Sequence, residues 1–167
     1  MFKPYRKIHR LGKEETEGIL VGTCYIQEKV DGANTSIWLE NGVVRCGSRS
    51  QDLWGKSFNG FPEYVSNHDG IQKFFAENGS KYRLYGEWLV RHTIAYKELA
   101  YKKFYLFDIY DEVQEKEEAI KLVDEIINKG FHFDGDGVHF TKGKHFVDTL
   151  KSGDSIVIYA GISFKLK

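Results

Sequence analysis

Hydrophobic and polar residues in this 167-residue chain fall into short segments separated by turn-forming residues. Runs rich in aromatic and β-branched residues, bounded by Gly, Asn or Asp, are typical of strands. Strands are therefore predicted at residues 23–30, 35–40, 43–47, 82–88, 103–110, 137–141, 155–160 and 163–167. The pair Asn41-Gly42 between two of these runs is a strong signal for a type I′ hairpin.

Two other segments have apolar residues at helical spacing. Ile71, Phe74 and Phe75 predict a helix over residues 69–78, and Gly79 is suited to end it. The longest apolar stripe predicts a helix over residues 115–129, closed by Gly130. Residues 48–60 are polar and contain glycine, which indicates a loop. The elements together predict an α+β fold dominated by antiparallel sheet.

Composition narrows the class of protein. Hydrophobic residues make up 41% of the chain and aromatic residues 15%, so a packed core is expected rather than disorder. No linker or repeat interrupts the chain, which predicts one domain over residues 1–167. Lys plus Arg equals Asp plus Glu at 24 each, so a nucleic-acid partner would need a local basic patch.

Two cysteines are too few for a disulfide framework and lack metal-ligand spacing. Cys24 and Cys46 lie on segments that read as neighbouring strands, and both are expected to pack as small apolar residues in a reducing compartment. Trp38, Trp54 and Trp88 are also expected to pack. With neither a signal peptide nor a membrane-length apolar run, the sequence predicts a cytoplasmic protein without membrane contact.

The segment Glu28-Lys29-Val30-Asp31-Gly32-Ala33-Asn34 places a lysine beside a tight Asp-Gly turn at a predicted strand end. A lysine serves covalent chemistry when it is deprotonated and held against an electrophile. Lys-x-Asp-Gly resembles the motif of nucleotidyltransferases that form a covalent lysine–NMP intermediate. The preceding Glu28 and the following Asn34 make the segment similar to RNA ligases of the T4 RNA ligase 2 type.

Further motifs resemble this family in the order it requires. Arg49 follows the predicted hairpin, Glu87 stands in Gly86-Glu87, and Phe107 stands in an aromatic strand. Asp136 in Asp136-Gly137-Val138 replaces the family's glutamate, with Asp134 as a competitor for its role. Lys165 and Lys167 close the chain, and strand alternation would put both on one face.

The resemblance implies a role for each residue. Glu28 and Phe107 would hold adenine, and Glu87 and Arg49 the ribose and phosphate side. The full set implied to bind nucleotide is Glu28, Asp31, Gly32, Asn34, Arg49, Glu87, Phe107, Lys165 and Lys167. Glu87 with Asp136 would hold Mg²⁺ or Mn²⁺.

Attack by Lys29 needs a neutral amine, whereas an unperturbed lysine has a pKa of about 10.4. Nearby cations such as Mg²⁺ and the two terminal lysines would lower that pKa, and neighbouring carboxylates would raise it. As an isolated residue, Lys29 beside an Asp-Gly turn would more commonly be an ordinary surface lysine. The histidines, His92 among them, lack zinc spacing and are expected at the surface or as satisfied interior groups.

The resemblance thus implies a minimal ATP-dependent RNA ligase with an ATP-grasp-like nucleotidyltransferase core. It would pass AMP from Lys29 to a 5′-phosphate end of RNA, nicked duplex or DNA for joining to a 3′-hydroxyl. The alternatives are a DNA ligase, a GTP-using capping-type enzyme, and a non-catalytic module that binds nucleotide or RNA. Relatives carry a C-terminal accessory domain that is not expected here, so a partner protein could supply end recognition.

Overall fold

The computed structural model describes residues 1–18, 24–113, 116–118 and 156–160. The chain divides into two compact units. The first unit comprises residues 1–5 and 31–138, and the second comprises residues 6–30 and 139–167. The prediction of one domain over residues 1–167 stays a prediction.

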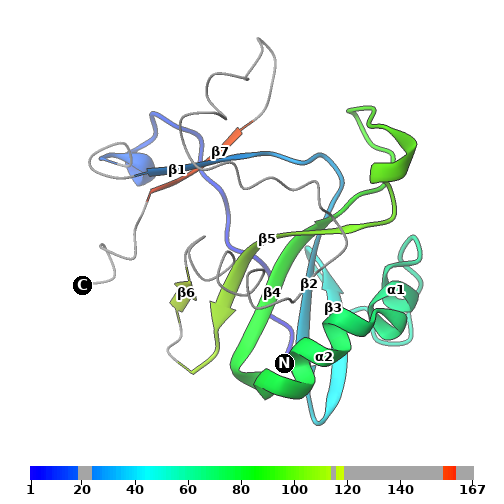
Figure 1. Cartoon of the computed structure of the whole chain (residues 1–167). Helices are drawn as coiled ribbons and strands as arrows, with labels where there is room; N and C mark the ends of the chain where they lie inside the picture. Colours follow the sequence, from blue (N-terminus) through cyan, green and yellow to red (C-terminus); the bar gives the residue numbers. More distant parts are fainter. Residues whose placement is uncertain (19–23, 114–115, 119–155, 161–167) are drawn as a thin grey trace. The chain divides into compact units, whose positions relative to one another are not determined.

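The first unit contains a five-stranded antiparallel sheet with strand order β3-β2-β4-β5-β6 (Figure 1). Its strands are β2 (Ala33–Glu40), β3 (Val43–Ser48), β4 (Tyr82–Trp88), β5 (Phe104–Asp111) and β6 (Lys116–Glu118). The hairpin between β2 and β3 is confirmed, because Asn41 and Gly42 have φ angles of 51° and 75°, as a type I′ turn requires. The predicted α+β class with antiparallel pairing is also confirmed.

Two helices, α1 (Phe61–Asn67) and α2 (Asp69–Asn78), contribute the aromatic core of this unit. The Phe61 ring lies 5.3 Å from that of Trp88 and 5.8 Å from that of Phe104, measured between centroids. The predicted bounds of α2 are confirmed, and Gly79 follows it with a φ of 59°. Helix α1 was not predicted, although Pro62 in its first turn is a recognised start signal.

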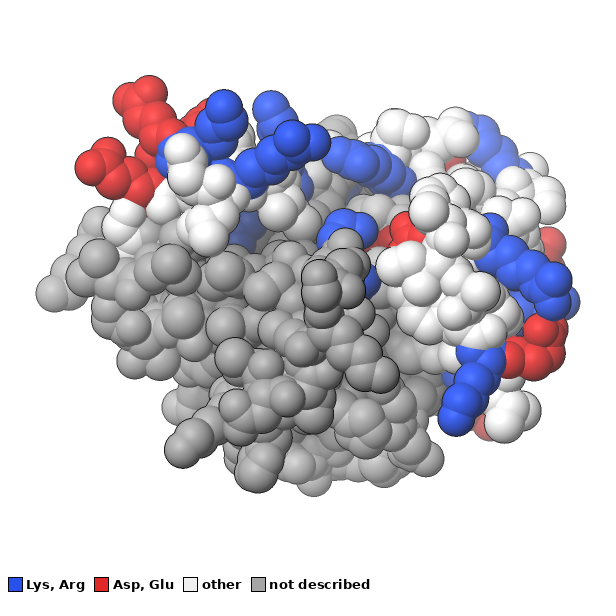
Figure 2. Space-filling view, turned by 90° about the horizontal axis from the view of Figure 1, so that it is seen from above, with Lys and Arg blue, Asp and Glu red and all other residues white. Residues whose placement is uncertain are grey.

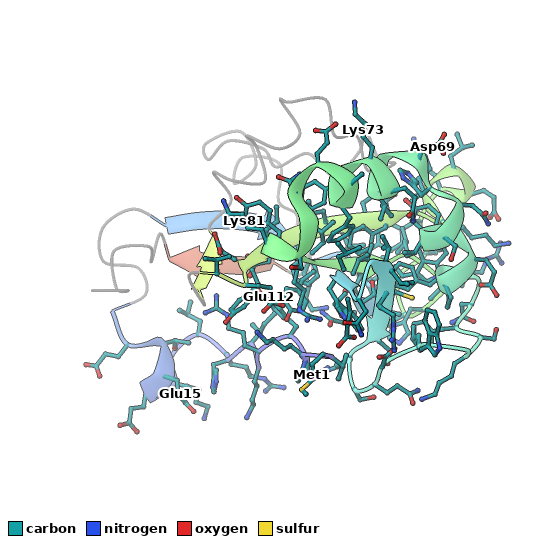
Figure 3. All side chains as sticks on the ribbon, turned by 90° about the horizontal axis from the view of Figure 1, so that it is seen from below. Met1, Glu15, Asp69, Lys73, Lys81 and Glu112 are labelled. Atoms are coloured by element: carbon teal, nitrogen blue, oxygen red, sulfur yellow. The ribbon has the colours of Figure 1, made fainter. Side chains whose placement is uncertain are left out.

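The N-terminal segment Met1–Tyr5 contacts the strand side chains that alternate with the core-facing ones. Figure 3 shows Met1 across the sheet from Asp69 and Lys73 of α2. The Phe2 ring lies 6.1 Å from the Trp38 ring, and Tyr85 Oη donates to the Lys3 carbonyl at 3.2 Å. Successive β4 side chains therefore pack against different parts of the chain.

One predicted helix is wrong where the structure describes it. Residues 116–118 of the predicted helix 115–129 form β6, which pairs with the end of β5 from Ile109 to Asp111. Pairing with the sheet supplies hydrogen-bond partners for this backbone, and it overrides the helical spacing of apolar residues further along. Residues 119–129 of that prediction lie outside the described residues.

Two expectations about packing residues also need correction. Trp38 and Trp88 are buried, but the Trp54 side chain is 61% exposed and its ring lies under the Arg45 guanidinium at 4.4 Å. Cys46 is buried as expected, and burial raises the pKa of its thiol to about 12. The strands of the two cysteines are not paired with each other, because Cys24 lies opposite Ala160 of β7 and Cys46 lies opposite Ile37 of β2.

The second unit, in its described part, contains a two-stranded antiparallel sheet of β1 (Cys24–Glu28) and β7 (Ile156–Ala160). Cys24 pairs with Ala160, and Glu28 pairs with Ile156. A 3₁₀ turn, η1 (Glu14–Thr16), precedes β1; the first unit has η2 (Gly79–Lys81) and η3 (Glu98–Ala100). Predicted strands 137–141 and 163–167 lie outside the described residues. No helix in the described ranges is long and apolar enough to cross a membrane.

Candidate active site

The Asp31-Gly32 turn, which follows Lys29 in the sequence, is held by hydrogen bonds from two directions. The Gly32 N–H donates to Glu87 Oε1 at 3.0 Å, and the Asp31 N–H donates to Tyr96 Oη at 2.9 Å. A Cβ atom on Gly32 would lie 2.6 Å from the Trp88 carbonyl oxygen. Glycine is therefore required here for close approach of two backbones.

The Asp31 carboxylate faces the loop after β4. Its Oδ2 accepts from the Ile94 N–H at 2.8 Å, and its Oδ1 lies 2.9 Å from His92 Nδ1. The Ile94 hydrogen bond, helped by His92 and opposed by desolvation, lowers the pKa of Asp31. Asp31 is thus an acceptor for this loop at neutral pH.

Two other predicted site residues share one place in the sheet. Asn34 of β2 pairs with Glu87 of β4, so both occupy the same row of the five-stranded sheet. Glu87 also stands opposite Tyr105 of β5. The structure therefore brings Gly32, Asn34 and Glu87 together, although the Lys-x-Asp-Gly and Gly-Glu segments are more than 50 residues apart.

Phe107 lies at an irregularity in β5. Tyr85 pairs with Asp108, whereas Gly86 pairs with Leu106, which leaves Phe107 as the extra residue of a β-bulge. Its side chain is half-buried, and its ring meets the Tyr5 ring edge-on at a centroid distance of 5.0 Å. Tyr5 Oη in turn donates to Asp108 Oδ2 at 2.9 Å. A β-bulge changes the direction of a side chain relative to the regular alternation of a strand. The Phe107 side chain therefore departs from the direction that regular pairing of β5 would give it.

Arg49 directly follows β3 and is exposed. Its strand neighbour Ser48 pairs with Thr35, so Arg49 extends from the sheet next to the β2 end that carries Asn34. Its predicted nucleotide contact stays a prediction.

The remaining predicted residues belong to the second unit or lie outside the described ranges. Lys29 follows the last residue of β1 and is exposed, and its predicted role as nucleophile stays a prediction. Glu28 is the last residue of β1. Residues outside the described ranges are Asp134, Asp136, Lys165 and Lys167.

The loop residues that contact Asp31 were not predicted from the sequence. His92 was assigned no role, and Tyr96 was not singled out. Their partner lies 61 and 65 residues away, respectively. Tyr96 does not belong to a sequence motif that would have indicated the contact. The position of its loop depends on the sheet, which fixes where the loop begins and ends.

Within the described ranges, no group of three or more His, Cys, Asp or Glu side chains is arranged to hold a metal ion. Glu87 is the one member of the predicted Glu87–Asp136 pair that falls inside these ranges.

Solved structures with the same fold define the class of protein. An archaeal ATP-dependent RNA ligase matches with a TM-score of 0.58 at 16% identity, over 77% of this chain and 35% of that one. The Naegleria gruberi RNA ligase with pyrophosphate matches with a TM-score of 0.52 at 19% identity, over 64% and 32%. A mutant of that ligase with ATP and manganese matches with a TM-score of 0.50 at 21% identity, over 65% and 34%. The chain thus has an RNA ligase fold and spans about a third of these proteins' length.

The family follows from the sequence match. The RNA ligase family model matches residues 22–159, which include the Lys-x-Asp-Gly segment and Glu87. The chain belongs to the RNA ligase family. No curated protein matches it.

Proposed function

We propose that this chain is the adenylyltransferase part of an ATP-dependent RNA ligase, with Lys29 as the nucleophile. The observation that carries the proposal is the hydrogen bond from the Gly32 N–H to Glu87 Oε1 at 3.0 Å. It joins the Lys-x-Asp-Gly and Gly-Glu segments, two motifs that this family is expected to use together. Family membership and the fold shared with ATP-bound and pyrophosphate-bound ligases support the same assignment.

The proposed first step transfers AMP to the chain. Lys29 Nζ attacks the α-phosphorus of ATP, a P–N bond forms, and the bond from that phosphorus to the bridging oxygen breaks. Pyrophosphate leaves with the electron pair, and the amine releases a proton to solvent. Negative charge grows on the α-phosphate in the transition state, so lysines aimed there, such as Lys165 and Lys167, would accelerate the step.

Two transfers then complete the proposed sealing reaction. A 5′-phosphate oxygen of RNA attacks the phosphorus of lysyl-AMP, the P–N bond breaks, and Lys29 takes a proton. A 3′-hydroxyl next attacks the 5′-phosphate, loses its proton, and releases AMP. The first of these transfers uses the lysine as covalent carrier. The second starts from AMP joined to the RNA end and involves no bond to the lysine.

The nucleotide contacts in the proposal follow the resemblance. Glu28 and Phe107 would hold adenine, and Arg49 with Glu87 the ribose and phosphate side. A divalent metal would bind Glu87 and Asp136, where it would neutralise phosphate charge. ATP and manganese in a mutant of the Naegleria ligase support this choice of ligands.

Mass spectrometry of the intact protein tests the first step. After incubation with ATP and Mg²⁺, we expect a mass increase of one AMP moiety in the wild type and none in Lys29→Ala. Lys73→Ala, at an exposed lysine of α2, is the matched control and should form the adduct. No adduct in the wild type, from protein first stripped of bound AMP, would reject the proposal in favour of a non-catalytic module. An adduct with GTP in place of ATP would instead indicate a capping-type enzyme.

RNA is the proposed acceptor. Figure 2 shows acidic and basic side chains together on the described surface, in keeping with the chain's equal numbers of the two. Labelled AMP transferred to a 5′-phosphorylated RNA, and less well to DNA of the same sequence, would support the assignment. The reverse preference would favour the DNA ligase alternative. Adding a candidate partner protein in the same assay would test whether end recognition comes from outside the chain.

A further inference from the structure

The loop that connects β4 to η3 holds the Asp31-Gly32 turn at more than one point. It contributes a hydroxyl group, a backbone amide and an imidazole: Tyr96 Oη, the Ile94 N–H and His92 Nδ1. All three bind Asp31, at 2.9, 2.8 and 2.9 Å respectively. Asp31 therefore makes both backbone and side-chain hydrogen bonds to one loop.

This loop is itself braced. Its base is closed by the Leu89 N–H donating to the Lys103 carbonyl at 3.0 Å and the Lys102 N–H donating to the Leu89 carbonyl at 2.8 Å. The Tyr96 N–H donates to Tyr101 Oη at 2.9 Å, and the two rings meet edge-on at 6.3 Å. Tyr101 thus contacts both the backbone and the ring of Tyr96, and the Tyr96 hydroxyl accepts the hydrogen bond from the Asp31 N–H.

The other side of the turn is fixed by the sheet. The neighbouring N–H, that of Gly32, donates to Glu87, and the Gly32 backbone lies against Trp88 and Leu89. Two successive amides therefore bond to different side chains, one from the loop and one from β4. Such a double attachment fixes both the position and the direction of the peptide plane.

Fixing Asp31 limits where the lysine backbone can go. Lys29 is two residues earlier in the sequence, and two residues of fully extended chain span at most about 7 Å. A carrier lysine needs close alignment with the phosphorus it attacks, and about 1 Å of misplacement can cost about 100-fold in rate. A turn held in place would restrict the positions open to the lysine backbone through the chain connection alone.

We propose that Tyr96 and His92 are positioning residues for the adenylylation step, acting through Asp31 on the backbone that carries Lys29. This inference rests on the proposed function. It assigns Asp31 to the loop rather than to direct contact with nucleotide, since both of its carboxylate oxygens have loop partners.

Tyr96→Phe tests the hydroxyl alone, because it keeps the ring against Tyr101. We expect roughly a tenfold fall in the single-turnover rate of adduct formation at saturating ATP, since one hydrogen bond to the turn is lost. The ATP concentration for half-maximal rate should stay unchanged. Tyr110→Phe in β5 is the matched control and should keep the wild-type rate. A shift confined to the ATP concentration dependence would overturn the positioning role and indicate nucleotide contact.

His92 provides a test by conservative rescue. His92→Ala should slow adduct formation several-fold, and His92→Asn should restore part of the rate, because an amide can still donate to Asp31. Equal rates in all three proteins would overturn the assignment of His92.

A second readout separates this inference from the proposed function. Hydrogen exchange over residues 29–34 should be faster in Tyr96→Phe than in the wild type, because the Asp31 amide loses its acceptor. If the wild type forms no adduct, the proposed function fails, and hydrogen exchange alone shows whether Tyr96 holds the Asp31-Gly32 turn. Unchanged exchange in Tyr96→Phe would then overturn that role of Tyr96. Thermal unfolding of each variant identifies any global loss of structure.

Discussion

Two carboxylates of the first unit hold distant segments of the chain together, and they do so in different surroundings. Glu112 binds Arg83, at 2.8 Å, and Lys3 of the N-terminal segment. Asp31 binds the loop through Ile94 and His92. The Arg83 side chain is only 2% exposed, whereas that of His92 is 57% exposed.

The Glu112 cluster involves a buried cation that depends on its partners. The Arg83 guanidinium lies over the Trp38 ring at 4.5 Å and donates to the Met1 carbonyl at 2.7 Å. Figure 3 shows Glu112 close to Lys81, whose carbonyl accepts from the Glu112 N–H at 2.8 Å. Without Glu112 the buried Arg83 cation would lose its carboxylate, and without Arg83 the Met1 carbonyl would lose its donor, so this cluster should govern stability.

The Asp31 cluster has an exposed partner, His92, and fewer charges, although the Asp31 carboxylate is no more exposed than that of Glu112, at 16% against 20%. Its hydrogen bonds come from a hydroxyl group, an amide and a histidine, each of which water could partly replace. Its loss should therefore change geometry more than the free energy of unfolding. The contrast teaches that a similar arrangement, a carboxylate holding a remote segment, serves the fold in one place and the candidate site in the other.

The largest expected effect on stability comes from a substitution within the buried Glu112 cluster. Arg83→Met keeps most of the side-chain volume but removes the hydrogen bonds to Glu112 and to the Met1 carbonyl, and it should lower the free energy of unfolding by about 3 kcal/mol. Urea unfolding measures this loss. The control is Lys73→Met, which removes the exposed ion pair with Glu77 and should cost about 0.5 kcal/mol or less. Similar losses in the two variants would contradict the distinction drawn between the two clusters.

Sequence patterns predicted the elements whose signals are local. The Asn41-Gly42 hairpin and the α2 helix with Gly79 were confirmed, because turn chemistry and helical spacing act over a few residues. The helix predicted over residues 115–129 failed at β6, where pairing with β5 decided the structure. Helix α1 was missed, although Pro62 in its first turn is a start signal.

The residues of the candidate site also divide into those with a local sequence signal and those without one. Gly32 and Glu87 could be selected from the sequence because each stands in a short motif. Tyr96 and His92 could not, because their common partner Asp31 lies more than 60 residues away and only the folded sheet brings them together. Phe107 was selected by resemblance, but its place at a β-bulge depends on the register between β4 and β5.

The next largest effect is expected at Gly32, where a substitution should change both the geometry of the turn and the free energy of unfolding. Gly32→Ala should lower the free energy of unfolding by about 2 kcal/mol, because its Cβ would overlap the Trp88 carbonyl oxygen. It should also slow lysyl-AMP formation, since the turn must shift. The measurements are urea unfolding and the rate of adduct formation.

Gly42→Ala is the matched control for that substitution. Gly42 has a φ of 75° in the hairpin and nothing within 4 Å of an added Cβ atom. It should cost about 1 kcal/mol through backbone strain alone, with no change in adduct formation. A slower reaction in Gly42→Ala would mean that lost stability, rather than the position of the turn, limits the rate.

The smallest effect is expected on acidification. Burial would raise the pKa of Glu112, but hydrogen bonds from Lys3 and Arg83 outweigh it and lower that pKa from 4.5. A lowered folded-state pKa means that the stabilising contribution is complete above the unfolded value of 4.5 and is lost as pH falls through the folded value. Unfolding free energies measured between neutral pH and about pH 2.5 should therefore decline in the wild type and decline less in Glu112→Gln.

Asp31→Asn completes the comparison under acid. The pKa of Asp31 is also lowered, from 3.8, chiefly by the Ile94 N–H, so stability is again lost as pH falls through the folded value. In both Glu112→Gln and Asp31→Asn the free energy of unfolding should decline less on acidification than in the wild type. Only Asp31→Asn should also slow adduct formation at neutral pH. Slower adduct formation in Glu112→Gln would mean that the N-terminal segment also positions the site, and the separation of roles between the two carboxylates would fail.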